Sequence, residues 1–234
     1  MKLSIIIPTL NEVKNVPLVF KLIEDAVRLV PTEHEIIFVD DQSNDGTIET
    51  IETAVRKNNN IHLVKSPQRK GLGHALKLGV ARSKADLVLF LDCDVSIQAE
   101  DLVKLLREAH ADKMVIGSRY IAGGQVIGAP KLKVFISKCL NWTISKYLSI
   151  PAIDISHSLR VFPAKKIKMP ASDTHPAFFW ELSIIGHLSN LKIQEVPITF
   201  RERLFGVSKN KAKAMLYSVI RGIKTVLKLK NVTR

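Results

Sequence analysis

The chain has 234 residues, 46% of them hydrophobic, so it is long enough and apolar enough to bury one sizeable core. Its 35 Lys and Arg residues outnumber 22 Asp and Glu residues, and the formal net charge of +13 indicates an anionic partner: nucleic acid, an acidic membrane surface or a phosphorylated substrate. The two cysteines, Cys93 and Cys139, exclude a disulfide framework and the usual zinc-ligand spacing.

Apolar runs with strand character alternate with helical patterns through the first half of the chain. We expect strands at 2–7, 35–39, 61–64, 87–91 and 114–116, and helices at 16–30, 47–57, 73–81 and 99–110. Short, continuous apolar runs are typical of strands buried on both faces, as in a parallel sheet. These five βα-type units predict a Rossmann-like half.

The alternation breaks after Gly117, where a glycine-rich loop follows. We then expect a helix at 131–148, short strands at 159–162 and 193–199, and a helix between them at 178–188. The prediction is therefore a single α/β domain over residues 1–205 with a mixed sheet in its second half. Residues 206–234 are predicted to form a basic loop and an amphipathic helix.

Two acidic clusters stand where apolar runs end: Asp40-Asp41, and the pair Asp92 and Asp94 around Cys93. Open α/β sheets bind ligands at the carboxyl ends of their strands. Two carboxylates separated by one residue can both approach one divalent ion that also holds a substrate diphosphate. Either cluster alone would be explained by a solvated turn. The two together predict a metal-dependent site for a nucleotide or nucleotide sugar.

Several sequence motifs, taken in their order along the chain, resemble those of a known family. They lie at residues 4–12, 39–47, 71–75, 92–94 and 117–124, with a late motif at 195–200 and 203–209. In this order they resemble glycosyltransferase family 2, and within it the polyprenyl-phosphate sugar synthases of the dolichol-phosphate mannose synthase type. A lone Gly-x-Gly such as Gly71 and Gly73 would carry little weight, because a loop that enters a helix often needs glycine. The resemblance covers nearly the whole chain.

The resemblance implies a GT-A fold and an inverting transfer of a hexose, with mannose from GDP-mannose favoured, to a polyprenyl phosphate such as dolichyl phosphate. It also implies Mg²⁺ or Mn²⁺ as cofactor. Because a phosphate monoester has a second pKa near 6, the acceptor is mostly a dianionic nucleophile at neutral pH, and no general base is required. We expect one displacement without a covalent enzyme intermediate.

The nucleotide-sugar donor is expected at the ends of the first strands. Pro8, Asn11 and Glu12 end the first strand and are predicted to line the nucleotide pocket, with Asp40 near the base or ribose. The full predicted donor-binding set is Pro8, Leu10, Asn11, Glu12, Val39, Asp40, Asp41, Lys70, Gly71, Asp92, Cys93, Asp94, Arg203 and Lys209.

The metal ligands implied by the resemblance are Asp92 and Asp94, with Asp94 as the direct ligand. Related synthases often carry Gln two residues later as a further ligand, where this chain has Ser96. Arg203 and Lys209 correspond to contacts with the donor diphosphate, whose charge they would neutralise as the glycosidic bond breaks. The predicted catalytic set is Asp92, Asp94, Arg119 and Arg203.

The acceptor phosphate is expected to meet a basic surface. Arg119 resembles the residue that holds this phosphate, for which a forked guanidinium is suited. Lys133, Ser137 and Lys138 correspond to acceptor-site residues, with Lys where the family usually has Arg; a solvated helix face is the alternative for the lysines. In the segment 154–162, Ser158 and Leu159 replace the family's Gly and Phe, and we expect Ser156 and Arg160 to line the cleft.

Other functions remain open from the sequence. One is a family 2 transferase that uses UDP-glucose or UDP-N-acetylglucosamine, or one with a glycan hydroxyl acceptor and Glu181 as general base. A non-enzymatic alternative is a basic nucleic-acid-binding protein. That alternative is disfavoured because only 6% of the residues are aromatic and none interleave with the basic residues.

The expected location is the cytoplasm, peripheral at the cytoplasmic face of the membrane. The sequence has no run of about 20 apolar residues, the length that a membrane-spanning helix requires. Its first apolar run indicates a strand rather than a signal peptide. From Ala212 to Lys228 an apolar helix face lies opposite Arg221, Lys224 and Lys228. Such a basic helix can lie on an anionic membrane surface or pack on the catalytic domain, and the sequence leaves both open.

Overall fold

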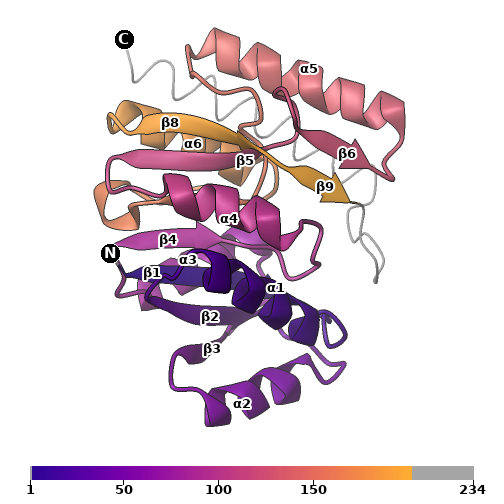
Figure 1. The fold of residues 1–234 in the computed structure, drawn as a ribbon, viewed down its shortest axis with the longest axis vertical. Helices are drawn as coiled ribbons and strands as arrows, with labels where there is room; N and C mark the ends of the chain where they lie inside the picture. The colour runs from indigo at the N-terminus through magenta and orange to yellow at the C-terminus, as the bar shows by residue number, and fades with distance from the viewer. Residues whose placement is uncertain (1, 202–234) are drawn as a thin grey trace.

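The computed structural model describes residues 2–201, so Met1 and residues 202–234 lie outside the described part. The described residues form nine strands and six α-helices. The helices pack around one central sheet (Figure 1). The first half contains β1 (Leu3–Thr9), α1 (Val16–Leu29), β2 (His34–Asp40), α2 (Thr47–Lys57), β3 (Ile61–Lys65), α3 (Leu72–Arg82), β4 (Leu87–Phe90), α4 (Ala99–Glu108) and β5 (Lys113–Ser118). The second half contains β6 (Gln125–Ile127), α5 (Lys131–Tyr147), β7 (Arg160–Phe162), a short 3₁₀ turn (Ala164–Lys166), α6 (Ala177–Leu188), β8 (Lys192–Pro197) and β9 (Thr199–Arg201).

The main sheet has seven strands in the order β3-β2-β1-β4-β7-β5-β8. All neighbouring pairs are parallel except those of β7, which runs antiparallel to both β4 and β5. In that register Arg160 at the start of β7 lies opposite Phe90 and Ile116, near the carboxyl ends of β4 and β5. The loop that precedes β7 therefore reaches the same sheet edge as the loops that follow β1, β2, β4 and β5. We call this edge the carboxyl edge.

The strands are buried on both faces, as their continuous apolar runs predict. In β1, Ile5 and Ile7 pack into one core and Ile6 into the other, because successive side chains of a strand point to opposite faces. Helices α1, α2 and α4 cover the first face, and α3 and α6 cover the second (Figure 1). Helix α5 is joined to α6 by a hydrogen bond from Trp180 Nε1 to Asn141 Oδ1 at 3.2 Å. These two layers of helices make the sheet a rigid support for its carboxyl edge.

The start of α4 shows how the sequence sets a helix boundary. The backbone N–H of Gln98, the N-cap, donates to Asp101 Oδ2 at 3.3 Å, which is one half of a capping box. Thr199 N donates to the same oxygen at 3.3 Å, and Lys104 Nζ lies 2.9 Å from Asp101 Oδ1. The carboxylate expected in the first turn thus also links α4 to the start of β9.

The predicted elements between residues 2 and 201 are confirmed to within a few residues at their ends, and so is the mixed sheet of the second half. Two expectations are wrong in detail. The fifth βα unit has no helix directly after β5, since the glycine-rich loop contains the short strand β6. The single strand expected at 193–199 is interrupted at Ile198 and forms β8 and β9, and β9 leaves the main sheet to pair with β6. The boundary at residue 205 and the C-terminal helix lie outside the described residues.

Within residues 2–201, none of the helices combines the length and the apolar character that crossing a membrane requires.

Candidate active site

The acidic pair after β4 lies at the carboxyl edge. Asp92 Oδ2 accepts a hydrogen bond from Ser158 Oγ at 2.5 Å, and Asp94 Oδ1 accepts the backbone N–H of Ser96 at 3.3 Å. Asp94 and Ser96 are buried, whereas Asp92 is partly exposed. Both carboxylates are therefore held by the protein beside one another at the end of a buried strand.

This pair fits a divalent ion that shares its coordination with a substrate. Among residues 2–201, no group of three or more His, Cys, Asp or Glu side chains could by itself hold a metal ion. Mg²⁺ is usually bound through one or two carboxylates together with substrate phosphates, and it keeps several waters. Two hard oxygen donors at the carboxyl edge match that donor set.

Cys93 lies between the two acidic residues, with its side chain turned into the core. Burial, and next the negative charges of Glu12, Asp94 and Asp92, raise the pKa of its thiol well above the ordinary value. Cys93 therefore stays a neutral thiol. Any direct contact between Cys93 and the predicted nucleotide-sugar donor would have to use the Cys93 backbone.

The two carboxylates after β2 have different environments. Asp40 is buried and accepts hydrogen bonds from Thr9 Oγ1 at 3.0 Å, Ser43 N at 2.7 Å and Ser43 Oγ at 2.6 Å. Asp41 Oδ2 accepts the backbone N–H of Gly71 at 3.3 Å, and its buried Oδ1 has no hydrogen-bond partner among the described residues. Asp40 thus fixes the loop after β2, while Asp41 has an acceptor atom for a ligand.

The loop after β1 is joined to the loop after β2 by hydrogen bonds. Asn11 donates its backbone N–H to Ser43 Oγ at 2.8 Å, and its Oδ1 accepts the backbone N–H of Asn44 at 2.9 Å. Glu12 donates its backbone N–H to Thr47 Oγ1 at 2.8 Å. Asn11 adopts a left-handed conformation with φ of 56°, which asparagine tolerates better than most residues. Asn11 and Glu12, both predicted to bind the nucleotide-sugar donor, therefore belong to one connected rim.

The remaining residues that were predicted to bind the nucleotide-sugar donor differ in solvent exposure. Val39 is fully buried in the core, so its side chain does not face the rim. Pro8 and Leu10 are partly buried at the end of β1, and Lys70 is exposed. Gly71 is exposed and has φ of 93°, a conformation that suits glycine just before α3.

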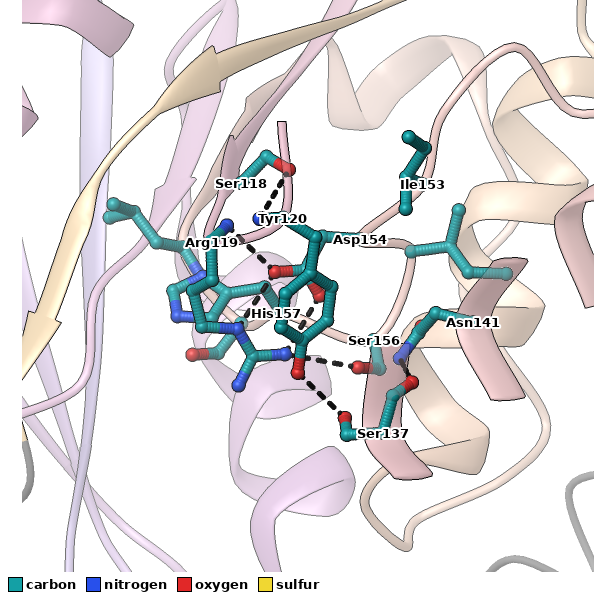
Figure 2. A network of polar contacts seen from close by, with 12 residues as sticks. Ser118, Arg119, Tyr120, Ser137, Asn141, Ile153, Asp154, Ser156 and His157 are labelled. Atoms are coloured by element: carbon teal, nitrogen blue, oxygen red, sulfur yellow. Dashed lines mark hydrogen bonds and ion pairs between the residues drawn. The ribbon is translucent and has the colours of Figure 1, made fainter. Parts of the chain in front are cut away.

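Arg119, directly after β5, is fixed by a buried carboxylate, as Figure 2 shows. Its Nε and Nη2 donate to the two oxygens of Asp154 at 2.7 Å each, and its backbone N–H donates to Asp154 Oδ2 at 2.9 Å. Asp154 is fully buried, and the side chain of Arg119 is 16% exposed. Burial alone would raise the pKa of Asp154, but the charge and hydrogen bonds of Arg119 lower it below its ordinary value.

A second carboxylate holds the Asp154 backbone in place. Glu195 in β8 accepts the backbone N–H groups of Ile153 and Asp154, each at 2.8 Å. Two residues further on, Ser156 Oγ accepts a hydrogen bond from Arg119 Nη2 at 3.4 Å. The loop before β7 is therefore tied both to β8 and to the guanidinium of Arg119.

Ser137 connects helix α5 to this network (Figure 2). Tyr120 donates its hydroxyl to Ser137 Oγ at 2.8 Å, and the ring of Tyr120 lies 4.8 Å from the guanidinium carbon of Arg119. The Ser137 carbonyl accepts Asn141 Nδ2 at 2.8 Å. Of the acceptor residues predicted on α5, Ser137 thus joins the surroundings of Arg119, whereas Lys133 and Lys138 are exposed along the helix.

The expectation that Arg160 lines the cleft is wrong, because its side chain is fully buried beneath the loop. Its guanidinium donates to Ser183 Oγ at 2.9 Å, to the Ile155 carbonyl at 3.1 Å and to the His157 carbonyl. Burial lowers the pKa of Arg160 to about 9. Arg160 therefore stabilises the loop before β7 from the side of the core and does not contact a ligand.

Glu181 is engaged in a structural role. Its carboxylate oxygens accept the backbone N–H groups of Ala171 and Ser172 at 2.8 and 3.0 Å, and the residue is buried. His157 is buried near Arg119, and burial is the main cause that lowers its pKa to about 3. His157 is therefore neutral at physiological pH.

Several residues at this edge were not among the predicted site residues: Asp154, Glu195, Tyr120 and Ser158. The one available signal was the segment 154–162 itself, which resembles a family motif that begins with Asp. Arg203 and Lys209, both predicted to contact the donor, lie outside the described residues.

The fold is that of GT-A glycosyltransferases. Mannosyl-3-phosphoglycerate synthase from Rubrobacter xylanophilus matches with a TM-score of 0.71 at 16% identity, covering 99% of this chain and 75% of the other. Glucosyl-3-phosphoglycerate synthase from Mycobacterium tuberculosis, in complex with Mn²⁺, UDP-glucose and phosphoglyceric acid, matches with a TM-score of 0.69 at 16% identity, covering 96% and 79%.

The sequence comparisons give the family. The model of glycosyl transferase family 2 matches residues 4–168. An undecaprenyl-phosphate mannosyltransferase of Micrococcus luteus is 31% identical over 89% of this chain and 87% of its own length. A polyprenol monophosphomannose synthase of Mycolicibacterium smegmatis is 34% identical over 88% and 79%. A dolichol-phosphate mannosyltransferase of Pyrococcus furiosus is 32% identical over 97% of this chain, which spans 64% of that longer protein. The chain belongs to glycosyltransferase family 2 and is a glycosyltransferase.

Proposed function

We propose that this enzyme transfers mannose from GDP-mannose to the phosphate of a polyprenyl phosphate, with inversion at the anomeric carbon and with Mg²⁺ or Mn²⁺ bound. The observation that carries the proposal is the loop before β7, because it contacts the Asp92 carboxylate through Ser158 and the Arg119 guanidinium through Asp154. A donor diphosphate at the first group and an acceptor phosphate at the second would meet across this loop. Relatives at 31–34% identity with mannosyltransferase and mannose synthase names support the choice of sugar and acceptor.

The acceptor phosphate is assigned to Arg119. The bonds to Asp154 use Nε and Nη2, so Nη1 is the amino group that would meet the phosphate. The pairing with Asp154 keeps the guanidinium charged and fixes its plane, which lowers the entropy cost of binding an anion. Ser137 and the exposed Lys133 and Lys138 extend this polar surface along α5, and we assign them to the same phosphate.

A phosphate acceptor also fits the environments of Glu181 and His157. Glu181 accepts two backbone N–H groups and does not face Arg119 as a proton acceptor. The lowered pKa of His157 makes it a weak base. A glycan hydroxyl would need a base within hydrogen-bond reach, whereas a dianionic phosphate needs none.

The donor diphosphate is assigned to the neighbourhood of Asp92 and Asp94, with Asp94 as metal ligand and Ser96 beside it. A bound Mg²⁺ or Mn²⁺ would offset the negative charge that develops on the leaving diphosphate. Asp41 Oδ1, buried and without a partner among the described residues, suits an N–H donor of the nucleobase. Asn11 and Glu12 shape the rim of this pocket, and Arg203 and Lys209 complete the proposed phosphate contacts.

Peripheral association with a membrane is supported by the outer surface of α5. Exposed apolar side chains on this helix are Leu132, Phe135, Ile136, Trp142 and Tyr147, and exposed lysines are Lys131, Lys133, Lys138 and Lys146. A helix with apolar and basic side chains at its surface binds anionic membranes in their interfacial region. Ser137 of the same helix contacts Tyr120 beside Arg119, so a lipid phosphate at this membrane surface would lie close to the acceptor site.

The test is transfer of a labelled sugar into lipid. The protein is incubated with Mn²⁺ or Mg²⁺, a polyprenyl phosphate, and labelled GDP-mannose, UDP-glucose or UDP-N-acetylglucosamine, and the lipid is then extracted. We expect label in the lipid from GDP-mannose, its loss with EDTA, and a β-linked product by NMR. Free polyprenol is the matched control acceptor and should take up no label. Transfer to polyprenol, or label from the UDP sugars alone, would contradict the proposal.

A further inference from the structure

Ser158 makes a contact that joins two distant parts of the chain. Its hydroxyl donates to Asp92 Oδ2 at 2.5 Å across 66 residues of sequence. Hydrogen bonds from a hydroxyl to an ionised carboxylate are short and about twice as strong as neutral ones. Serine stands here where the resembled family has glycine, which has no side chain to make this bond.

The loop that carries Ser158 is rigidly supported. Arg160 binds the carbonyls of Ile155 and His157 from below, and Leu159 is buried in the core. Ser158 itself is only 7% exposed. The hydroxyl is therefore held in place by packing and does not have to be ordered when a ligand binds.

We propose that Ser158 is a positioning residue for Asp92, setting the orientation in which this carboxylate receives the metal–nucleotide complex. Rotation of an aspartate carboxylate about its last torsion is broad, so a fixed donor on Oδ2 also fixes the direction of Oδ1. Hydrogen-bond partners of metal-binding carboxylates commonly change metal affinity by about 10-fold to 100-fold when they are removed. This inference rests on the proposed use of a divalent ion with the nucleotide.

The experiment compares Ser158→Ala, Ser158→Gly and Ser158→Thr with the unchanged protein. Binding of Mn²⁺ in the presence of GDP, and separately of UDP, is measured by electron paramagnetic resonance of free Mn²⁺, which requires neither lipid nor turnover. We expect Ser158→Ala and Ser158→Gly to weaken Mn²⁺ binding by about 10-fold. Ser158→Thr, which keeps the hydroxyl, should bind within about threefold of the unchanged protein. Ser189→Ala, at an exposed serine after α6, is the matched control and should bind normally.

Steady-state kinetics supply a second readout. The alanine variant should need about 10-fold more Mn²⁺ for half-maximal rate, while its KM for polyprenyl phosphate stays the same. Equal Mn²⁺ binding by the serine and alanine forms would overturn the positioning role and leave the proposed function intact. An equal decrease in all three variants, threonine included, would also overturn it, since the loss would then not follow the hydroxyl. If the unchanged protein binds no Mn²⁺ with either nucleotide, the metal-dependent function fails, and this inference fails with it.

Discussion

The Asp154–Arg119 pair is the contact on which the geometry of the proposed acceptor site depends. Replacing Asp154 with alanine removes a carboxylate that accepts three hydrogen bonds from Arg119, at 2.7, 2.7 and 2.9 Å. The guanidinium would remain largely buried without its counterion. Breaking a buried pair by removing one partner costs about 3–5 kcal/mol. For a chain of this size that corresponds to a fall in Tm of roughly 6–20 °C.

The measurement is the Tm by differential scanning fluorimetry or calorimetry at neutral pH. Glu52→Ala is the matched control, because Glu52 also pairs with a cation, Lys65 at 2.8 Å, but at the exposed surface. Exposed pairs contribute little, so this control should unfold close to the temperature of the unchanged protein. The reasoning is refuted if Asp154→Ala lowers Tm no more than Glu52→Ala does.

Three further predictions address pH, packing and membrane binding. In the folded protein the pKa of Asp154 is lowered below its value in the unfolded chain, which is near 3.9. The ionised carboxylate therefore contributes fully to stability above the unfolded-state pKa, and this contribution is lost as the pH falls through the folded-state pKa. The Tm difference between the unchanged protein and Asp154→Asn should therefore be constant from about pH 5 to 8 and shrink in more acidic buffer; a difference that grows on acidification would contradict this. Gly73→Ala should destabilise the protein by about 1–3 kcal/mol, measured by chemical denaturation, because a Cβ there would lie 2.7 Å from the Asp173 Cα and from a ring carbon of Phe178. Phe135→Glu should reduce co-sedimentation with anionic vesicles without changing Tm, and unchanged sedimentation would exclude α5 as the membrane-binding surface.

The regular elements could be predicted because their signals are local. In β1 and β2 the continuous apolar runs indicate strands buried on both faces, and the structure confirms this with core residues on each side. The apolar spacing of α1 and the acidic first turn of α4 are equally local, and both helices begin at the predicted residue. The acidic pair at the end of β4 was found for the same reason, since the strand end and the carboxylates are adjacent in sequence.

The features that the sequence did not reveal depend on contacts between distant residues. The three residues of β6 carry no periodicity, and they form a strand because they pair with β9. Arg160 was expected in the cleft because the segment 154–162 resembles a motif of the family. It is instead buried among backbone carbonyls, which only the tertiary fold brings together. In the same way, no local pattern indicates that Asp154 pairs with Arg119 rather than with solvent.

The antiparallel insertion of β7 explains why one loop serves both sides of the site. A parallel strand between β4 and β5 would begin at the opposite edge of the sheet, and its preceding loop would lie far from Asp92 and Arg119. Because β7 runs in reverse, its first residue lies opposite Phe90 and Ile116, and the loop that enters it crosses the carboxyl edge. Ser158 then reaches Asp92, on the proposed donor side, and Asp154 reaches Arg119, on the proposed acceptor side, from the same short segment. A substitution that displaces the whole loop is therefore expected to change donor and acceptor binding together, whereas Ser158→Ala, which removes one contact to Asp92, is expected to change donor binding alone.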